Sequence, residues 1–305
     1  MSPDQYTIKE QHLAVGDGHK LYVQEWGNPK AKRTFIFLHG GPGSGINDGY
    51  KAFFDPSTQH VIFFDQRGCG QSTPAGKLEA NTTQDLVEDI NKIADAYKIK
   101  TFTLVGGSWG SCLALAYGIA HPKRVEAMVL RGIFTGAQDE IDFIDKGYFS
   151  AFFPEVWEEF VQRAPEEFQD NPGAYHSAQA LGKDLKAARK SAYAYSEMES
   201  SLLRLDDRHT PESIEDFDFY GARIEVHYLA NRCFMPDMFI VNNASKLTMP
   251  IWIVQGRYDN VCPPMGAYRL HKALPNSQLS WTVAGHSGGE RSNYDLTRFT
   301  INQLN

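Results

Sequence analysis

A Gly-Gly-Ser-Trp-Gly motif at residues 106–110 directly follows the apolar run 102–105. A strand that enters G-x-S-x-G and leaves into a helix makes a sharp turn, which strains the serine backbone and exposes its hydroxyl at the carboxyl edge of a sheet. Glycines are needed there because side chains would clash with the neighbouring strand and helix. The motif therefore predicts a nucleophilic Ser108 or, since the pattern is short, a plain strand-to-helix turn.

Size and composition are those of an ordinary globular protein. The chain has 305 residues, of which 42% are hydrophobic and 22% charged. Its formal net charge of −7 argues against non-specific nucleic-acid binding, which needs a basic face. We expect no membrane span, no secretion signal in the polar segment 1–6, and a cytoplasmic location, because the four cysteines are scattered without a C-x-x-C pair. The same scatter suggests neither a metal site nor a disulfide framework.

Short, nearly continuous apolar runs recur along the chain and are typical of strands buried on both faces of a parallel sheet. They lie at residues 34–38, 61–64, 102–105, 127–130 and 251–254. Helical patterns lie at residues 86–94, 111–120, 267–273 and 290–303. The alternation predicts an α/β fold with a mostly parallel, doubly wound sheet.

This alternation of strand and helix stops between residues 136 and 246. The stretch is rich in Phe, Tyr, Glu and Ala at helical spacing and contains no clear buried strand, and the sheet pattern resumes at Pro250. We therefore expect residues 136–246 to form a helical cap, inserted between the two parts of one core at residues 1–135 and 247–305.

Two further residues follow strand-like runs and complete a chain order of Ser, Asp and His. Asp259 comes just after the run 251–254, and His286 just after the run 279–283. A serine hydroxyl needs a base to accept its proton, and the base needs an acid to orient it. Because the carboxyl ends of parallel strands meet at one sheet edge, we expect these residues to form the catalytic triad of an α/β-hydrolase fold with Ser108.

Each member of the predicted triad also has a plainer interpretation. Asp259 alone could be a turn residue, and His286 a loop histidine. Other histidines are weaker candidates for the base, because His271 falls inside a helical pattern and His227 falls in the cap. The joint order and strand-end placement favour the triad.

A second glycine-rich turn, His-Gly-Gly-Pro-Gly at residues 39–43, follows the run 34–38. Glycines let backbone amides approach a substrate oxygen closely, so we expect the amides of Gly41 and Trp109 to form an oxyanion hole. A phosphate-binding loop is excluded because no Gly-Lys-Ser/Thr follows, and a dinucleotide-binding loop because G-x-G-x-x-G is absent at this strand end.

Four motifs together resemble those of the proline iminopeptidases, or prolyl aminopeptidases. They are His-Gly-Gly-Pro-Gly at 39–43, Asp-Gln-Arg-Gly-Cys-Gly-Gln-Ser at 65–72, Gly-Gly-Ser-Trp-Gly-Ser at 106–111 and Gly-Arg-Tyr-Asp at 256–259. The resemblance runs from the N-terminal region to the last helix. It implies an α/β-hydrolase core with a helical cap, no cofactor, and release of an N-terminal residue, preferably proline, from short peptides with a free N-terminus.

The resemblance also implies acidic cap residues that hold the protonated amine of the substrate. The segment Ala-Arg-Ile-Glu-Val-His-Tyr at 222–228 resembles the family's A-R-I-E-x-H-Y and points to Glu225. The segment Tyr-Ser-Glu-Met-Glu at 195–199 resembles the family's W-S-x-W-E and points to Glu199. Glu197 is the alternative at this second position, and a solvated helix face is the plain interpretation of Glu199.

Other functions stay open because Tyr195 and Met198 stand where the family has tryptophans, which leaves the strictness for proline undetermined. An esterase, lactonase or amidase would use the same triad, and a non-catalytic ligand-binding protein would share only the fold. Serine rather than aspartate at the turn disfavours an epoxide hydrolase.

We expect no catalytic cysteine, because neither Cys112 nor Cys262 has a paired histidine.

Overall fold

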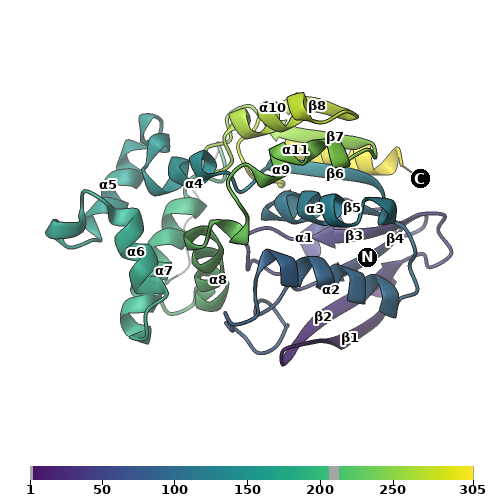
Figure 1. Ribbon diagram of the computed structural model, residues 1–305, viewed down its shortest axis with the longest axis horizontal. Helices are drawn as coiled ribbons and strands as arrows, with labels where there is room; N and C mark the ends of the chain where they lie inside the picture. Colours follow the sequence, from purple (N-terminus) through teal and green to yellow (C-terminus); the bar gives the residue numbers. More distant parts are fainter. Residues whose placement is uncertain (1–2, 206–212, 305) are drawn as a thin grey trace.

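The computed structural model describes residues 3–205 and 213–304 of the chain. Residues 206–212 of the predicted cap lie outside the described residues, as do Met1 and Ser2 of the polar N-terminal segment and Asn305. Figure 1 shows a twisted sheet covered by helices, with a separate lobe of helices beside it.

Eight strands of the described residues form one sheet, in the order β1-β2-β4-β3-β5-β6-β7-β8. They are β1 (Thr7–Gly16), β2 (His19–Gly27), β3 (Thr34–Leu38), β4 (His60–Phe64), β5 (Phe102–Ser108), β6 (Val125–Ile133), β7 (Ile251–Gly256) and β8 (Ser277–Thr282). The pairs β1–β2 and β2–β4 are antiparallel and the others are parallel. The predicted α/β fold with a mostly parallel sheet is confirmed.

The antiparallel hairpin of β1 and β2 is missing from the sequence prediction. Most side chains of β1 are exposed or half-buried, so the strand has no continuous apolar run. Its signal is the turn between the strands, where Asp17 and Gly18 both have positive φ, at 52° and 75°. An Asp-Gly pair between alternating apolar residues is typical of a two-residue hairpin turn.

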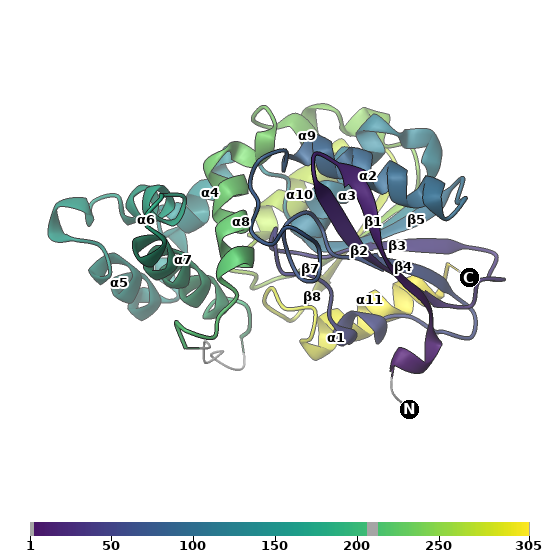
Figure 2. The ribbon, with the colours of Figure 1, turned by 90° about the horizontal axis from the view of Figure 1, so that it is seen from below.

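Helices cover both faces of the sheet. They are α1 (Asp48–Lys51), α2 (Thr83–Ala96), α3 (Trp109–Ala120), α4 (Gln138–Asp145), α5 (Pro154–Gln162), α6 (Pro172–Ala180), α7 (Leu185–Ser200), α8 (Phe219–Ala230), α9 (Phe239–Asn242), α10 (Pro264–Ala273) and α11 (Arg291–Asn302). Short 3₁₀ helices lie at Pro3–Tyr6, Pro122–Arg124, Tyr148–Ala151, Glu166–Phe168, Arg232–Phe234 and Ala244–Lys246. Figure 2 shows α2, α3 and α10 on one face of the sheet and α1 and α11 on the other, which separates two apolar cores.

The lobe beside the sheet consists of α4 to α8, with α8 nearest the core (Figures 1 and 2). Its centre is an aromatic cluster in which the ring of Phe160 packs against His176 and Tyr195. The short helix α9 falls within the range predicted for the cap, but it contacts α3 and α10 of the core.

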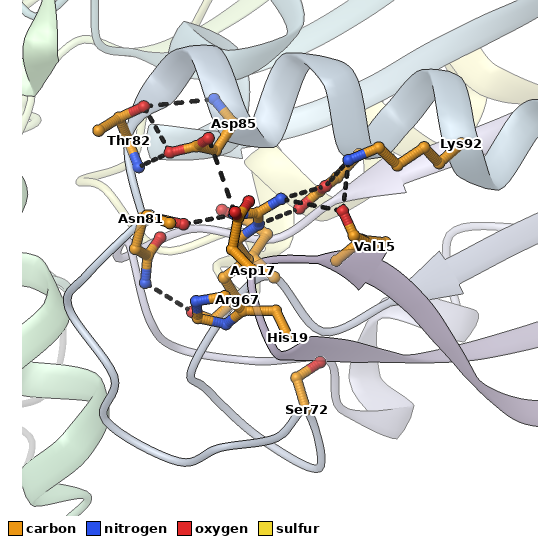
Figure 3. A network of polar contacts seen from close by, with 12 residues as sticks. Val15, Asp17, His19, Arg67, Ser72, Asn81, Thr82, Asp85 and Lys92 are labelled. Atoms are coloured by element: carbon orange, nitrogen blue, oxygen red, sulfur yellow. Dashed lines mark hydrogen bonds and ion pairs between the residues drawn. The ribbon is translucent and has the colours of Figure 1, made fainter.

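A buried arginine joins several segments on the α2 side of the core (Figure 3). Arg67 Nε and Nη2 donate to Asp89 Oδ2 and Oδ1 on α2, at 2.6 and 2.7 Å. Its third nitrogen donates to the carbonyl of Ala80, and its own carbonyl accepts from Asn81 Nδ2 at 3.1 Å. Such a bidentate pair fixes the geometry of the loop after β4, so the second of the four motifs has a structural role here.

Candidate active site

Ser108 lies at the turn between β5 and α3, where φ is 56° and ψ is −130°. A methyl group at Gly106 would strike the carbonyl of Gly110, and one at Gly110 would strike the carbonyl of Leu38. Both positions therefore require glycine. The backbone at Ser108 is in a region that side-chain-bearing residues rarely adopt, and such strain clusters at functional sites.

An acid–base pair lies in the loops after β7 and β8. His286 Nδ1 is 2.9 Å from Asp259 Oδ2, and both side chains are buried. The carboxylate accepts further bonds from Gln255 Nε2 at 3.1 Å and from the amides of Val261 and Cys262 at 3.0 and 2.8 Å. Because an ionised carboxylate only accepts, Nδ1 carries the imidazole proton and Nε2 is the basic nitrogen.

The loop that carries His286 is held from two sides. Glu290 accepts the amide of Gly285 at 2.8 Å, and Asn293 Nδ2 donates to the carbonyls on either side of the histidine, at 3.2 and 2.9 Å. From the cap, the carbonyl of Leu203 accepts the amide of Ser287 at 2.7 Å. The position of the histidine therefore depends on both α11 and the cap.

Ser108 and His286 line one cavity of about 540 Å³. Among the described residues they make no hydrogen bond to each other. Catalytic hydrogen bonds often tighten only when a substrate binds. The thiol of Cys262 lies beside the Ser108 hydroxyl. Burial and the nearby charge of Asp259 raise the pKa of that thiol well above its ordinary value, so the thiol stays protonated and is a poor nucleophile.

The two amides predicted for the oxyanion hole belong to the start of α3 and to the loop after β3. Trp109 is the first residue of α3, so its amide has no acceptor within the helix. Gly41 lines the cavity, and its amide donates to no acceptor in the described part of the chain. Its φ of +100° favours glycine, and a methyl group there would come within 2.6 Å of the Gly43 amide.

A buried network links this glycine turn to the serine turn, and the sequence did not predict it. Trp109 Nε1 donates to Gln66 Oε1 at 2.8 Å, and Gln66 Nε2 donates to the carbonyl of His39 at 3.0 Å. His39 Nε2 accepts the Gln66 amide at 3.0 Å, while its Nδ1 lies 2.9 Å from the Gly40 carbonyl. Burial lowers the pKa of His39, which keeps the ring neutral and able to accept. The only sequence signal was that these residues belong to three of the four motifs.

Two acidic side chains of the cap face the same cavity as the serine. Glu199 on α7 and Glu225 on α8 line it, and their carboxyl groups lie close to each other. Burial, and after it the charge of the neighbouring Glu199, raises the pKa of Glu225 well above its ordinary value. Glu197 instead pairs with Arg163 on another side of α7, so Glu199 is the one in the cavity.

The two positions that depart from the family pattern do not line this cavity. Tyr195 is buried in the cap, where its hydroxyl donates to Asp145 at 2.7 Å and lies 3.1 Å from the carbonyl of Gly173. Met198 is buried against α5. Both residues pack α7, the helix that carries Glu199. Within the part of the chain that is described, no cluster of three His, Cys, Asp or Glu side chains could hold a metal ion, and no helix could cross a membrane.

Comparisons with known proteins agree with this geometry. A family model of the alpha/beta hydrolase fold matches residues 33–288. The chain is 42% identical over 287 residues to a proline iminopeptidase of Arabidopsis thaliana, covering 92% of this chain and 75% of that one. It is 39% identical over 293 residues to a proline iminopeptidase of Neisseria gonorrhoeae, covering 92% of each.

Similar solved structures include a proline iminopeptidase of Mycobacterium smegmatis, with a TM-score of 0.61, 18% identity and 97% coverage of each chain. An esterase from Exiguobacterium antarcticum is similarly close, with a TM-score of 0.60, 20% identity and coverage of 94% and 96%. At these identities the structural likeness shows the fold alone. The fold and the site define a hydrolase of the α/β-hydrolase fold. Within that fold the chain belongs to the proline iminopeptidase family, as the four motifs predicted.

Proposed function

We propose that this hydrolase is a serine aminopeptidase that releases an N-terminal residue, preferably proline, from short peptides. The observation that carries the proposal is that Glu199 and Glu225 line the same cavity as Ser108 and His286. A free N-terminus is a cation, and each charge-assisted bond to a carboxylate is worth on the order of 1.5–3 kcal/mol. An N-terminal proline carries two N–H bonds on its ammonium group, one for each carboxylate.

In the proposed mechanism, Ser108 Oγ attacks the first peptide carbonyl while His286 Nε2 accepts its proton. Asp259 keeps the imidazole in the required tautomer and stabilises the imidazolium. The amides of Gly41 and Trp109 stabilise the oxyanion. His286 then protonates the leaving amine, and water hydrolyses the acyl-enzyme by the same route, with His286 again as the base.

The proposal explains why the enzyme would remove a single residue. The carboxyl pair belongs to the cap, residues 136–246 in our division of the chain, and would anchor the amine at one end of the cavity. Binding there would place the first peptide carbonyl at Ser108, and no residue could precede it.

We also propose a cytoplasmic location, which is supported by four free cysteines that are all buried.

The test compares two substrates, a prolyl arylamide and a neutral ester without an amine. Glu225→Gln removes one charge from the amine site, so we expect kcat/KM for the arylamide to fall about tenfold or more, while that for the ester stays within about twofold. Ser108→Ala serves as the inactive control for both substrates. Prolyl arylamides with a blocked nitrogen carry no ammonium group, so we expect their kcat/KM to be low as well.

Two results would argue for the alternative of an esterase, lactonase or amidase on the same triad. One is an equal loss of both activities in Glu225→Gln, or no loss of either. The other is cleavage of blocked prolyl substrates as fast as free ones. Failure of Ser108 to react with a fluorophosphonate probe would favour a non-catalytic binding protein.

A further inference from the structure

A guanidinium group on the sheet side of the cavity takes no part in the mechanism above. Arg131 near the end of β6 is half-buried and lines the cavity together with Ser108. Its Nη1 donates to the carbonyl of His286. Within residues 3–205 and 213–304, no carboxylate pairs with it.

This isolation contrasts with Arg67, the buried arginine of the core, whose guanidinium is fully engaged by Asp89 and a backbone carbonyl. A sheltered cation without a counter-ion loses hydration and gains no ion pair in return. The N–H groups at Nε and Nη2 of Arg131 also donate to no acceptor among the described residues. The guanidinium group can therefore bind an anionic ligand.

Glycines bring this guanidinium close to the reacting groups. A methyl group at Gly107, next to Ser108, would meet the guanidinium carbon of Arg131 at 3.0 Å. One at Gly288, two residues after His286, would meet its Nε at 3.0 Å. The guanidinium thus lies over the residue before the serine and against the histidine loop.

The charged side chains that line the cavity come from different parts of the chain according to sign. The carboxyl groups of Glu199, Asp218 and Glu225 come from the cap, whereas the guanidinium of Arg131 comes from the sheet. Ser108 lines the same cavity. A dipeptide at neutral pH is a zwitterion, and two residues span at most about 7 Å. A cavity of about 540 Å³ lies within the range of sites that enclose such small ligands.

We infer that Arg131 binds the terminal carboxylate of the leaving residue, so that free dipeptides with N-terminal proline are the preferred substrate class. The inference rests on the proposed function, in which the carboxyl pair anchors the amine. Arg131 would then hold the other end of the same substrate. Longer peptides would place a neutral peptide group beside the guanidinium and lose this contact.

The experiment compares prolyl-glycine with prolyl-glycinamide, which differ only in the terminal charge. The readout is the ratio of their kcat/KM values, measured from released proline. We expect a ratio of about ten or more in favour of the acid for the unmodified enzyme, since one good ionic contact is worth about tenfold. Arg131→Gln should lower the ratio about tenfold, Arg131→Lys should retain part of it, and added salt should lower it in the unmodified enzyme.

The exposed Arg291 on α11 provides a matched control, because Arg291→Gln removes the same charge outside the cavity and should leave the ratio unchanged. Equal loss of both activities in Arg131→Gln, with the ratio unchanged, would mean that Arg131 only supports the histidine loop. An unmodified enzyme that prefers the amide would also overturn the inference. If neither substrate is cleaved, nor any prolyl arylamide, the proposed function itself fails.

Discussion

At the scale of single residues, the proposed amine site consists of two neighbouring acids, Glu199 on α7 and Glu225 on α8. Because the pKa of Glu225 is raised, this carboxyl group keeps its proton to a higher pH than an ordinary glutamate. Burial is the largest cause of the raised pKa of Glu225, and the charge of Glu199 adds to it. A bound cationic amine favours the ionised form of Glu225, so binding of the substrate should release the proton of this carboxyl group.

A pH dependence follows from this raised pKa. Ionised carboxylates bind the ammonium group, so the ratio of kcat/KM for a prolyl arylamide to that for a neutral ester should increase as the pH rises through the raised pKa of Glu225. The ratio cancels pH effects on the triad, because both substrates use it. Glu225→Gln should make the ratio nearly independent of pH until the substrate amine itself loses its proton. A flat ratio in the unmodified enzyme would contradict the raised pKa of Glu225.

At the scale of elements, the connection from β6 to α4 is held by a buried acid. Glu140 in the first turn of α4 accepts the amide and hydroxyl of Thr135, at 2.7 and 2.9 Å. It also packs against Gly266 of α10, where a methyl group would strike its carboxyl. Burial raises the pKa of Glu140 from its ordinary 4.5 to about 7. Glu140 thus lies at the junction between the core and the cap.

Stability should depend on pH through this group. The folded protein keeps the proton of Glu140 up to about pH 7, whereas the unfolded chain loses it near 4.5. The free energy of unfolding therefore falls by about 3 kcal/mol as the pH rises through that interval. Glu140→Gln should remove this decrease, and the exposed Glu155→Gln should not. Denaturant unfolding between pH 4 and 8 provides the measurement, and parallel curves for the Glu140 variant and the unmodified protein would contradict the expectation.

At the scale of the whole molecule, Asn81 connects the cap to the core. Asn81 Nδ2 donates to the carbonyl of Arg67 in the core, and Asn81 Oδ1 accepts the hydroxyl of Tyr228 on α8 at 2.8 Å. The backbone carbonyl of Asn81 lies 3.1 Å from His227 Nε2 on the same helix. Since α8 also carries Glu225, this contact helps to hold that carboxyl group in the cavity that Ser108 lines.

Tyr228→Phe should weaken that connection without changing the packing of the ring. It leaves Asn81 Oδ1 buried without its donor, so the expected loss is about 1–3 kcal/mol in the free energy of unfolding. Amide hydrogen exchange of α8 should become faster than that of α2 and α3. Tyr220→Phe, on the same helix but exposed, is the matched control. Equal stability of the two variants would mean that the cap does not depend on this bond.

Much of this molecule follows from local sequence patterns. The central strands were predictable because strands buried on both faces are continuously apolar, and the serine turn because glycine is required where a side chain would strike a neighbouring carbonyl. The order of Ser108, Asp259 and His286 after strand-like runs placed them at one edge. The hairpin of β1 and β2 was missed because its exposed faces carry no such run.

Other features required the tertiary structure, because they depend on which side chains meet across long sequence separations. No spacing rule distinguishes Glu199 from Glu197; only the packing of α7 directs one into the cavity and the other to Arg163. The same packing buries Tyr195 and Met198 away from the cavity. In the sequence, Arg131 directly follows the apolar run 127–130 and gives no sign of a role. Its unpaired guanidinium fits beside the serine turn because Gly107 and Gly288 have no side chains there. The sequence by itself determined the fold and the order of the reacting groups, since both follow from local patterns. The folded chain alone decided which charges face the substrate, because that depends on contacts between distant segments.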